Sequence, residues 1–395
     1  MDGGVTAMTT EVIVVGGGAI GLAVADRLAE RGDRVVLVDA RLPGQASWAG
    51  SGALALIMPH LASPPLRELA RHSTKCWPDF AAGLEERSGV GIERRNTGLL
   101  RLVYSPSTQD SVRSTGEWLT ATGVRTEPLD ASQIATLAPL AVGPAWTALY
   151  QPELWQLRPP RLLRALQAAL TAHSSATVRR ELVVGLVQTA SRVRGVRLIG
   201  GEALYADEVV VSAGAWSGQL LAPVLGWPMP VRPVRGEIVC LDAADLPGVT
   251  AGPLLLGETN TYLVPRTDGR VLAGSTFVEA GFSARTSAAG LQHILRGALT
   301  MAPGLADAPM TAAWAGLRPG TPDGLPYLGR VPGLDGLIIA TGHFRDGLLL
   351  TPGTADIVAS IVHGKAVEID LGAYRPNRPA PRDSTVDAIG RSRSG

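Results

Sequence analysis

The spacing of hydrophobic residues along the chain changes twice within the first forty residues, from a continuous run to a helical period and back. Four consecutive β-forming residues, Val12 to Val15, predict a buried strand, and a similar run spans residues 35–38. Between these runs the apolar residues recur at helical spacing, at Leu22, Ala25, Leu28 and Ala29. Residues 11–40 therefore predict a strand, a helix and a second strand, which together form a βαβ unit.

The turn between the first strand and the helix has the spacing GxGxxG, at Gly16, Gly18 and Gly21. In such a turn the first glycine permits the tight bend, the second lets a pyrophosphate approach the backbone, and the third allows the helix to pack closely on the strand. Asp39 ends the unit, where a carboxylate can accept hydrogen bonds from a ribose. We therefore predict an adenine dinucleotide site. The alternative is a glycine-rich turn that binds nothing.

The rest of the chain alternates between two kinds of strand. Short apolar runs at 208–211 and 337–340, each followed by small residues, predict further buried strands of the first sheet. Residues 227–282 instead carry hairpin signals, including Asp268-Gly269, which predict antiparallel strands of a second domain. Helices are predicted at residues 65–88 with a break near Pro78, 107–123, 160–172, 288–301 and 347–361.

The charge balance excludes broad classes of partner. The 395 residues carry 36 basic and 35 acidic side chains, a formal net charge of +1, so no field attracts nucleic acid or an anionic membrane. The N-terminus lacks a basic signal-peptide region, and no window supplies the ~18 uninterrupted apolar residues of a membrane span. Cys76 and Cys240 lie outside any metal-ligand spacing, which favours a reduced, cytoplasmic setting without a metal. We therefore expect a small-molecule partner.

Several stretches resemble one enzyme family. These are VVGGGAIG near the N-terminus, SAGAWSG in the middle, and WAGLRPGTPDGLPYLGR with ATGHFRDGLLLTPGTA near the C-terminus. In the same order they are similar to the FAD-dependent amino acid oxidases related to D-amino acid oxidase and sarcosine oxidase, and most of all to the bacterial glycine oxidases of thiamine biosynthesis. The resemblance covers residues 10–370. It implies an α/β (α+β) fold, in which a Rossmann-type FAD-binding domain is interleaved with a substrate domain built on a large antiparallel or mixed sheet.

The domain boundaries follow from this resemblance and from the two kinds of strand. We expect a discontinuous FAD-binding domain and a substrate domain made of the segments between its parts. The FAD-binding segments are 8–85, 152–226 and 316–372, and the substrate segments are 86–151 and 227–315. Residues 376–395 are rich in proline, arginine and serine, which predicts a disordered tail.

The resemblance also implies which residues hold the FAD. Neither cysteine falls in the motif through which sarcosine oxidases attach their flavin, so the FAD is expected to be noncovalent. The glycine turn and the end of the second strand would hold the adenosine and pyrophosphate, and the later segments would border the flavin. The expected cofactor-binding residues are Gly16, Gly18, Ala19, Ile20, Gly21, Asp39, Ala40, Ala46, Ser47, Ser51, Gly52, Ala53, Val183, Ser212, Gly214, His343, Phe344, Arg345, Asp346, Gly347, Leu348 and Leu349.

Three residues are implied for the substrate pocket. In glycine oxidases the arginine of LRPG binds the substrate carboxylate, and that residue here is Arg318. A guanidinium can bind a carboxylate through two parallel charge-assisted bonds. Tyr262 and Arg345 would border the same pocket, although Tyr262 could be a core residue and either arginine could be structural. The sequence departs from the glycine oxidases at Ala53 and Phe277, where they often have methionine, and at Asn260, where a close homologue has histidine, so the pocket wall has changed.

The implied reaction is the oxidative deamination of a small amino acid, such as glycine, sarcosine or a D-amino acid. Hydride transfer from the α-carbon to flavin N5 would give an imine, which hydrolyses to a 2-oxo acid and ammonia or an amine. Oxygen would accept the electrons and form hydrogen peroxide. The alternatives are a dehydrogenase that reduces another acceptor, a non-catalytic FAD-binding protein and an NAD-dependent enzyme. Related glycine oxidases also imply a homo-oligomer.

Overall fold

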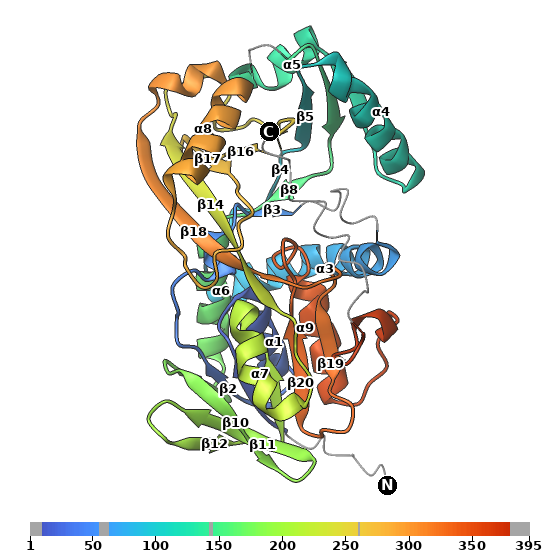
Figure 1. Ribbon diagram of the computed structural model, residues 1–395, viewed down its shortest axis with the longest axis vertical. Coiled ribbons are helices and arrows are strands. Elements are labelled where there is room, and N and C mark those ends of the chain that lie inside the picture. Colours follow the sequence, from blue (N-terminus) through green and yellow to red (C-terminus); the bar gives the residue numbers. More distant parts are fainter. Residues whose placement is uncertain (1–9, 55–62, 142–144, 260, 380–395) are drawn as a thin grey trace.

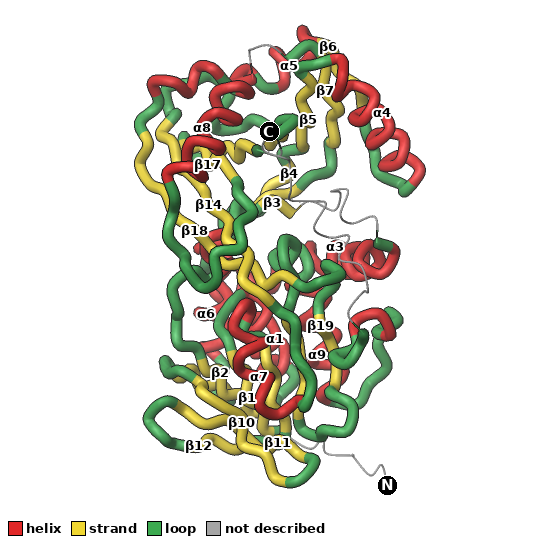
Figure 2. Tube along the Cα trace, in the orientation of Figure 1, coloured by secondary structure: helices red, strands yellow, loops and turns green. Residues whose placement is uncertain are grey.

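A computed structural model describes residues 10–54, 63–141, 145–259 and 261–379 of the chain. It contains two large sheets, one above the other in the view of Figure 1. Each sheet has its own hydrophobic cores and its own covering helices, and the helices of the lower half gather around its sheet in Figure 2. The mixed α/β fold with a large antiparallel sheet, expected from the sequence, is confirmed.

The first sheet has six strands, of which all but the edge strand β19 run parallel. Its strands alternate between two cores: Val12 and Val14 of β1 face one core, and Ile13 and Val15 face the other. Burial on both faces explains why these strands are uninterrupted apolar runs. The strand order is β19 (Tyr327–Arg330), β20 (Leu337–Thr341), β13 (Glu208–Val211), β1 (Glu11–Val15), β2 (Arg34–Val38) and β9 (Ala176–Arg179).

One face of this sheet is covered by four helices that pack on one another. The opposite face is covered by a short helix and a three-stranded antiparallel sheet. The first group is α1 (Ala19–Glu30), α3 (Pro64–Ser88), α6 (Pro159–Ala172) and α9 (Thr351–Val362). The second is α7 (Ser217–Leu225) with β10 (Val183–Thr189), β11 (Arg192–Leu198) and β12 (Ala203–Tyr205).

The second sheet has eight strands, antiparallel except where β15 pairs with β5. Its strand order is β18 (Met310–Gly320), β14 (Arg232–Asp242), β17 (Arg270–Gly274), β16 (Tyr262–Pro265), β15 (Leu254–Leu256), β5 (Leu99–Val103), β7 (Thr147–Gln151) and β6 (Glu127–Asp130). The helices of this half are α4 (Pro106–Ala121), α5 (Ala131–Leu137) and α8 (Ala288–Met301). Its widest cluster of buried residues packs α8 against the sheet.

A third, small sheet joins the two halves. It pairs β3 (Ala53–Leu54) and β4 (Arg95–Asn96) with β8 (Trp155–Gln156). The four-residue helix α2 (Ala46–Ala49) lies just before β3 and packs against β18. The chain crosses between the halves several times, so residues that are distant in sequence meet where the sheets approach each other.

Two boundaries differ from the sequence-based expectation. The predicted break near Pro78 is wrong, because α3 continues through this residue to Ser88. Trp77 and Phe80, on either side of it, are buried in the core, and the Trp77 indole donates to the carbonyl of Leu349 at 2.8 Å. This packing outweighs the backbone hydrogen bond that a proline removes. The helix predicted to start at residue 347 starts instead at Thr351.

The predicted disordered tail is described in part. Arg378 is anchored by Asp323, whose carboxylate accepts two hydrogen bonds from the guanidinium at 2.6 and 2.9 Å, and it stacks on the ring of Tyr327. The ordered structure therefore extends past the expected start of the tail at residue 376, and residues 380–395 lie outside the described residues. Among the helices described, none has the length and apolarity needed to cross a membrane.

Candidate cofactor and substrate site

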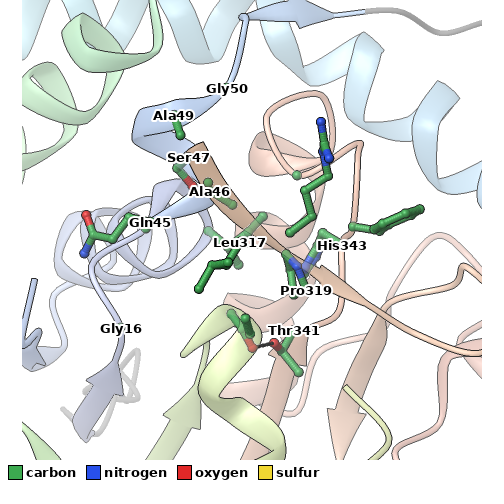
Figure 3. A pocket seen from close by; sticks show the side chains of 18 of the residues that line it. Gly16, Gln45, Ala46, Ser47, Ala49, Gly50, Leu317, Pro319, Thr341 and His343 are labelled. Carbon is green, nitrogen blue, oxygen red and sulfur yellow. Dashed lines mark hydrogen bonds between the residues drawn. The ribbon is translucent and has the colours of Figure 1, made fainter. Parts of the chain in front are cut away.

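A cavity of about 540 Å³ opens where the carboxyl ends of the parallel strands face the second sheet. Figure 3 shows the segment from Gln45 to Gly50 on one side of it and Pro319, Thr341 and His343 on the other, with Leu317 between them. The backbone amide of Leu317 donates to the carbonyl of Gly44 at 2.8 Å, which fixes β18 against the first half. Ligands of open parallel sheets bind at such carboxyl ends.

The glycine turn is shaped by close backbone contacts. Gly16 has a φ of +107°, and a Cβ there would lie 2.5 Å from the carbonyl oxygen of Ser212 on the neighbouring strand. A Cβ at Gly21 would collide with the carbonyl oxygen of Gly16 and the hydroxyl of Ser212. Gly18 is the N-cap of α1 and supplies no side-chain cap. The positive end of the helix therefore lies at the cavity without a side chain on Gly16, Gly17 or Gly18, which is typical of a phosphate site.

Asp39 stands beside this turn, at the end of β2. Its side chain is 8% exposed, lines the cavity and packs so closely that a Cβ on Gly17 would lie 2.6 Å from the carboxyl carbon. The amide nitrogen of Gln45 lies 3.4 Å from both carboxylate oxygens, and the guanidinium of Arg180 lies 3.5 Å from one of them. The carboxylate is thus held in place with room for further hydrogen bonds from a ligand.

Helix α2 and the loop that follows it are held by hydrogen bonds from both halves of the molecule. The hydroxyl of Ser47 accepts a hydrogen bond from the amide of Ala19 at 3.0 Å, which ties α2 to the start of α1. From the second sheet, Arg266 donates to the carbonyl of Ser51, to the carbonyl of Leu157 at 2.8 Å and to the side chain of Gln156 at 3.1 Å. Arg266 is 5% exposed, and burial lowers the pKa of its guanidinium to about 10.

Arg318 lies near the end of β18, at the cavity wall. Its guanidinium donates to the carbonyl of Thr276 at 3.0 Å and to the hydroxyl of Ser275 at 2.8 Å. Among the described residues no carboxylate pairs with it. Burial lowers its pKa to about 10, so the group remains cationic at neutral pH. A guanidinium has five N–H donors, so Arg318 keeps donors for a ligand anion in the cavity.

Phe277 stands between two cations. The guanidinium carbons of Arg318 and Arg345 lie 4.4 and 4.8 Å from its ring centroid, within the range of cation–π attraction. Its ring also makes an edge contact with Phe344, with the centroids 6.3 Å apart. Burial lowers the pKa of Arg345, against the raising effects of Asp346 and Tyr262. Tyr262 of β16 lines the same cavity, so all three expected pocket residues meet there.

His343 is fixed behind this wall. Its side chain is 4% exposed, and Nε2 lies 3.1 Å from the hydroxyl of Thr354 on α9. Burial lowers its pKa to about 4, so the imidazole is neutral at physiological pH. A neutral ring whose Nε2 is already hydrogen-bonded supports the loop of residues 343–348 better than it serves as a proton acceptor.

Most of the expected cofactor residues line this cavity. Three do not: Ala19 and Gly21 pack behind the turn, and Leu349 uses its carbonyl to accept from Ser73 and Trp77. The expected residues on the lining are Gly16, Gly18, Ile20, Asp39, Ala40, Ala46, Ser47, Ser51, Gly52, Ala53, Val183, Ser212, Gly214, His343, Phe344, Arg345, Asp346, Gly347 and Leu348. Their individual roles stay predictions, and Asn260 lies outside the described residues.

Other residues of the site were not expected from the sequence. Ser275 and Thr276 hold Arg318, and Arg266 holds Ser51. Arg266 follows β16 directly and precedes the Asp268-Gly269 turn, a position that suggests a solvated side chain. Its burial was therefore not visible in the local pattern.

Comparison with known proteins identifies the family. A family model described as FAD dependent oxidoreductase (DAO) matches residues 11–361. The chain belongs to this family. It is 37% identical to the glycine oxidase of Pseudomonas putida over 374 residues, which are 93% of this chain and 99% of that protein.

Solved structures of the family share the fold. The crystal structure of glycine oxidase from Geobacillus kaustophilus matches with a TM-score of 0.86 and 32% identity, covering 94% of this chain and all of that one. Iminodiacetate oxidase from Chelativorans sp. matches with a TM-score of 0.85 and 29% identity, covering 92% of this chain and 98% of that one. This family member is an FAD-dependent oxidoreductase, as the sequence led us to expect.

The residues present fit this cofactor. The start of α1 beyond the Ala19 amide, whose hydrogen bond Ser47 accepts, offers backbone to a pyrophosphate, with Gly16 and Gly17 leaving no side chain in the way. Asp39 offers a carboxylate for ribose hydroxyls. The small residues from Ser51 to Ala53 leave a shallow surface opposite the loop of residues 343–348, where a flat ring system can lie.

Proposed function

We propose that this protein is an amino acid oxidase of the glycine oxidase type, acting on a small amino acid or a related secondary amine. The observation that carries the proposal is Arg318, a partly buried guanidinium that lines the cavity and is held by two neutral oxygens. A partly desolvated cation that pairs with no carboxylate among the described residues favours an anionic ligand, and the α-carboxylate of an amino acid supplies one.

In this proposal the FAD is noncovalent and extends across the cavity. Gly16, Gly18 and the start of α1 bind the pyrophosphate, and Asp39 binds the adenosine ribose. The loop from Ala46 to Ala53 and the loop of residues 343–348 border the flavin. The bound flavin supplies the two-electron chemistry, by accepting a hydride from the α-carbon of the substrate.

The chain itself binds and orients the substrate. Arg318 fixes the carboxylate, and Tyr262 and Arg345 close the wall around it. Holding the carboxylate in one position limits the orientations of the α-carbon. This lowers the entropic part of the activation barrier. The resulting imine hydrolyses to a 2-oxo acid and ammonia or an amine.

The side chain of the preferred substrate depends on the wall. Ala53 and Phe277 replace the two methionines of the glycine oxidase pattern, and both line the cavity. Glycine, sarcosine, D-amino acids and iminodiacetate are therefore the first compounds to compare. The deciding experiment mixes each with the oxidised holoenzyme under anaerobic conditions and records the loss of the long-wavelength flavin absorbance. If none of them reduces the flavin, amino acid oxidation is wrong for this chain.

Oxygen is the proposed electron acceptor. Peroxide yield, measured against the reduction of an artificial dye, distinguishes an oxidase from a dehydrogenase that passes electrons to another partner. Near-stoichiometric peroxide supports the oxidase, whereas dye reduction with little peroxide supports the dehydrogenase. A homo-oligomeric state and a cytoplasmic location remain predictions from the sequence.

A further inference from the structure

A carboxylate lies buried behind the substrate wall, in the middle of β14. Glu237 has no exposed surface, and its neighbour Gly236 faces the cavity. Because successive side chains of a strand point to opposite faces, Glu237 points away from the cavity, toward the start of α8. A buried carboxylate is costly unless it is hydrogen-bonded, so its partners indicate its role.

Glu237 divides its two oxygens between two segments. Oε1 accepts hydrogen bonds from the amide of Ser287 at 2.7 Å and from its hydroxyl at 3.0 Å. Ser287 is the N-cap of α8, where negative charge is favourable. Oε2 accepts from the hydroxyl of Thr276 at 2.9 Å. Arg235 adds a more distant positive charge, 3.6 Å from Oε1.

Thr276 is the link to the cavity. Its hydroxyl donates to Glu237 and accepts from the backbone amide of Glu237 at 3.1 Å, so its donor and one of its acceptor positions are both used. The carbonyl of the same residue accepts from Arg318 at 3.0 Å. The hydroxyl side of Thr276 is therefore fixed by Glu237, and its carbonyl side fixes Arg318.

We propose that Glu237 is a positioning residue, which holds Arg318 in its carboxylate-binding orientation through Thr276. This inference rests on the proposed role of Arg318. Gly236 makes the arrangement possible, because a Cβ at that position would collide with the guanidinium that lies over the β14 backbone. The guanidinium therefore packs directly on the strand that carries Glu237.

The physical effect is on geometry rather than on charge. Glu237 does not contact Arg318, whereas Thr276 and Ser275 supply neutral acceptors for two of its N–H groups. These two bonds direct the remaining donors into the cavity, where a bidentate contact requires a defined plane. If the carbonyl of Thr276 turned, the guanidinium plane would turn with it, and a misplacement of about 1 Å can cost about 100-fold in rate.

A purely structural role is the competing explanation, because Glu237 also anchors the start of α8. The two roles use different oxygens, so they can be separated by substituting the partners. Thr276→Val removes the hydroxyl at nearly constant volume, Thr276→Ser retains it, and Ser287→Ala removes the contacts of the other side chain. The N-cap substitution Asp130→Ala, on the distant helix α5, matches Ser287→Ala in kind without touching this network.

The test measures ligand affinity in the flavin-loaded enzyme. Acetate and the neutral amide acetamide are titrated while perturbation of the flavin absorption spectrum is recorded. We expect Glu237→Gln and Thr276→Val to weaken acetate binding by about tenfold and acetamide binding by less than about twofold, because Arg318 distinguishes the two ligands by charge. Thr276→Ser should restore acetate affinity. Ser287→Ala and Asp130→Ala should lower the melting temperature and leave the acetate to acetamide ratio unchanged.

The other outcomes contradict either the positioning role of Glu237 or the proposed role of Arg318. If Thr276→Val leaves the ratio unchanged, or if Ser287→Ala changes it as much as Glu237→Gln does, Glu237 acts through α8 and the inference is overturned. The control for the proposed function is Arg318→Met. If this variant binds acetate as well as the parent enzyme, the carboxylate role of Arg318 is wrong; if it binds acetate weakly while Thr276→Val binds it normally, the inference about Glu237 is wrong.

Discussion

The two halves of the molecule treat buried charge in opposite ways. Around the first sheet, a buried carboxylate has basic partners within the protein: Asp26 pairs with the guanidinium of Arg87 at 2.8 Å and lies 3.3 Å from the imidazole of His173. Around the second sheet, the buried Arg266 and the partly buried Arg318 are held by neutral oxygens. The first arrangement is satisfied within the protein, whereas the second leaves positive charge beside the cavity.

The difference corresponds to what each half presents to a ligand. The first half offers backbone, in the glycine turn and at the start of α1, together with the carboxylate of Asp39, whereas Asp26 serves structure. The second half offers the guanidinium of Arg318, which pairs with no carboxylate among the described residues. Burying an unpaired cation costs stability, so its retention at a cavity indicates a function. Substitutions in each half test this comparison.

Substituting the unpaired cation of the cavity should have the largest effect. Arg318→Met removes the guanidinium while keeping an apolar side chain of similar reach against Phe277. We expect kcat/KM for an amino acid substrate to fall by about 10²–10³, which corresponds to about 3–4 kcal/mol of transition-state binding. Steady-state kinetics at saturating FAD measures this loss. Arg345→Met is the control, and an equal loss in both variants would mean that Arg318 has no special role.

Adding a side chain to the backbone cradle should have the next largest effect. Gly21→Val places atoms against the carbonyl of Gly16 and the hydroxyl of Ser212, so the turn must shift. Overpacking of this kind costs about 1–3 kcal/mol, which should weaken FAD binding by about 10- to 100-fold. Equilibrium dialysis of the apoprotein against FAD measures it. Gly200→Val is the control, because a Cβ there meets nothing within 4 Å and its φ is not positive. Comparable FAD affinity in both variants would contradict the proposed role of the glycine turn.

Arg266 tests whether the unpaired cations of the second half act alike. Arg266→Met leaves the oxygens of Ser51, Leu157 and Gln156 without their donor, at about 1–3 kcal/mol for each unsatisfied group. We expect FAD affinity to fall by about tenfold, because Ser51 lies on the cavity wall. Arg158→Met is the matched control, since that neighbouring arginine pairs with carboxylates. A larger loss of FAD affinity in the control would refute the prediction.

His343 gives the smallest effect, on stability. Its pKa is about 4 in the folded protein and about 6.5 in an unfolded chain, so the unfolded state binds the extra proton as the pH falls through this window. Stability is therefore lost on acidification, by about 1 kcal/mol between pH 6.5 and 5.5. Urea unfolding of the holoenzyme at both pH values measures it. His343→Gln should lose less, and an equal loss would show that this imidazole does not titrate as described.

The half built on the first sheet could be predicted from the sequence because its signals are local. Strand β1, the turn at Gly16 and helix α1 are contiguous, and β13 and β20 were predicted from short apolar runs followed by small residues. Buried parallel strands need such runs whatever the rest of the chain does. The start of α9 was placed too early, because the loop before it has a helix-like composition yet turns along the cavity wall.

For the half built on the second sheet, the sequence predicted only the presence of antiparallel strands and the family motif that contains Arg318. Arg318 was expected from its motif, but its partner Ser275 lies 43 positions away, and Arg266 lies 215 positions from Ser51. Such contacts depend on how β14, β17 and β18 are paired, and a single sequence does not specify this pairing. The role of Thr276 follows from the same pairing, so no pattern of spacing could have revealed it.

The cavity also joins the two ends of the chain. Part of its lining comes from the glycine turn at residues 16–18, and another part comes from residues 316–319 and 341–348. During synthesis on the ribosome the first part is therefore made long before the second part emerges. A nascent chain can therefore form its glycine turn early, but it can enclose a flavin only after residues 316–348 have been made.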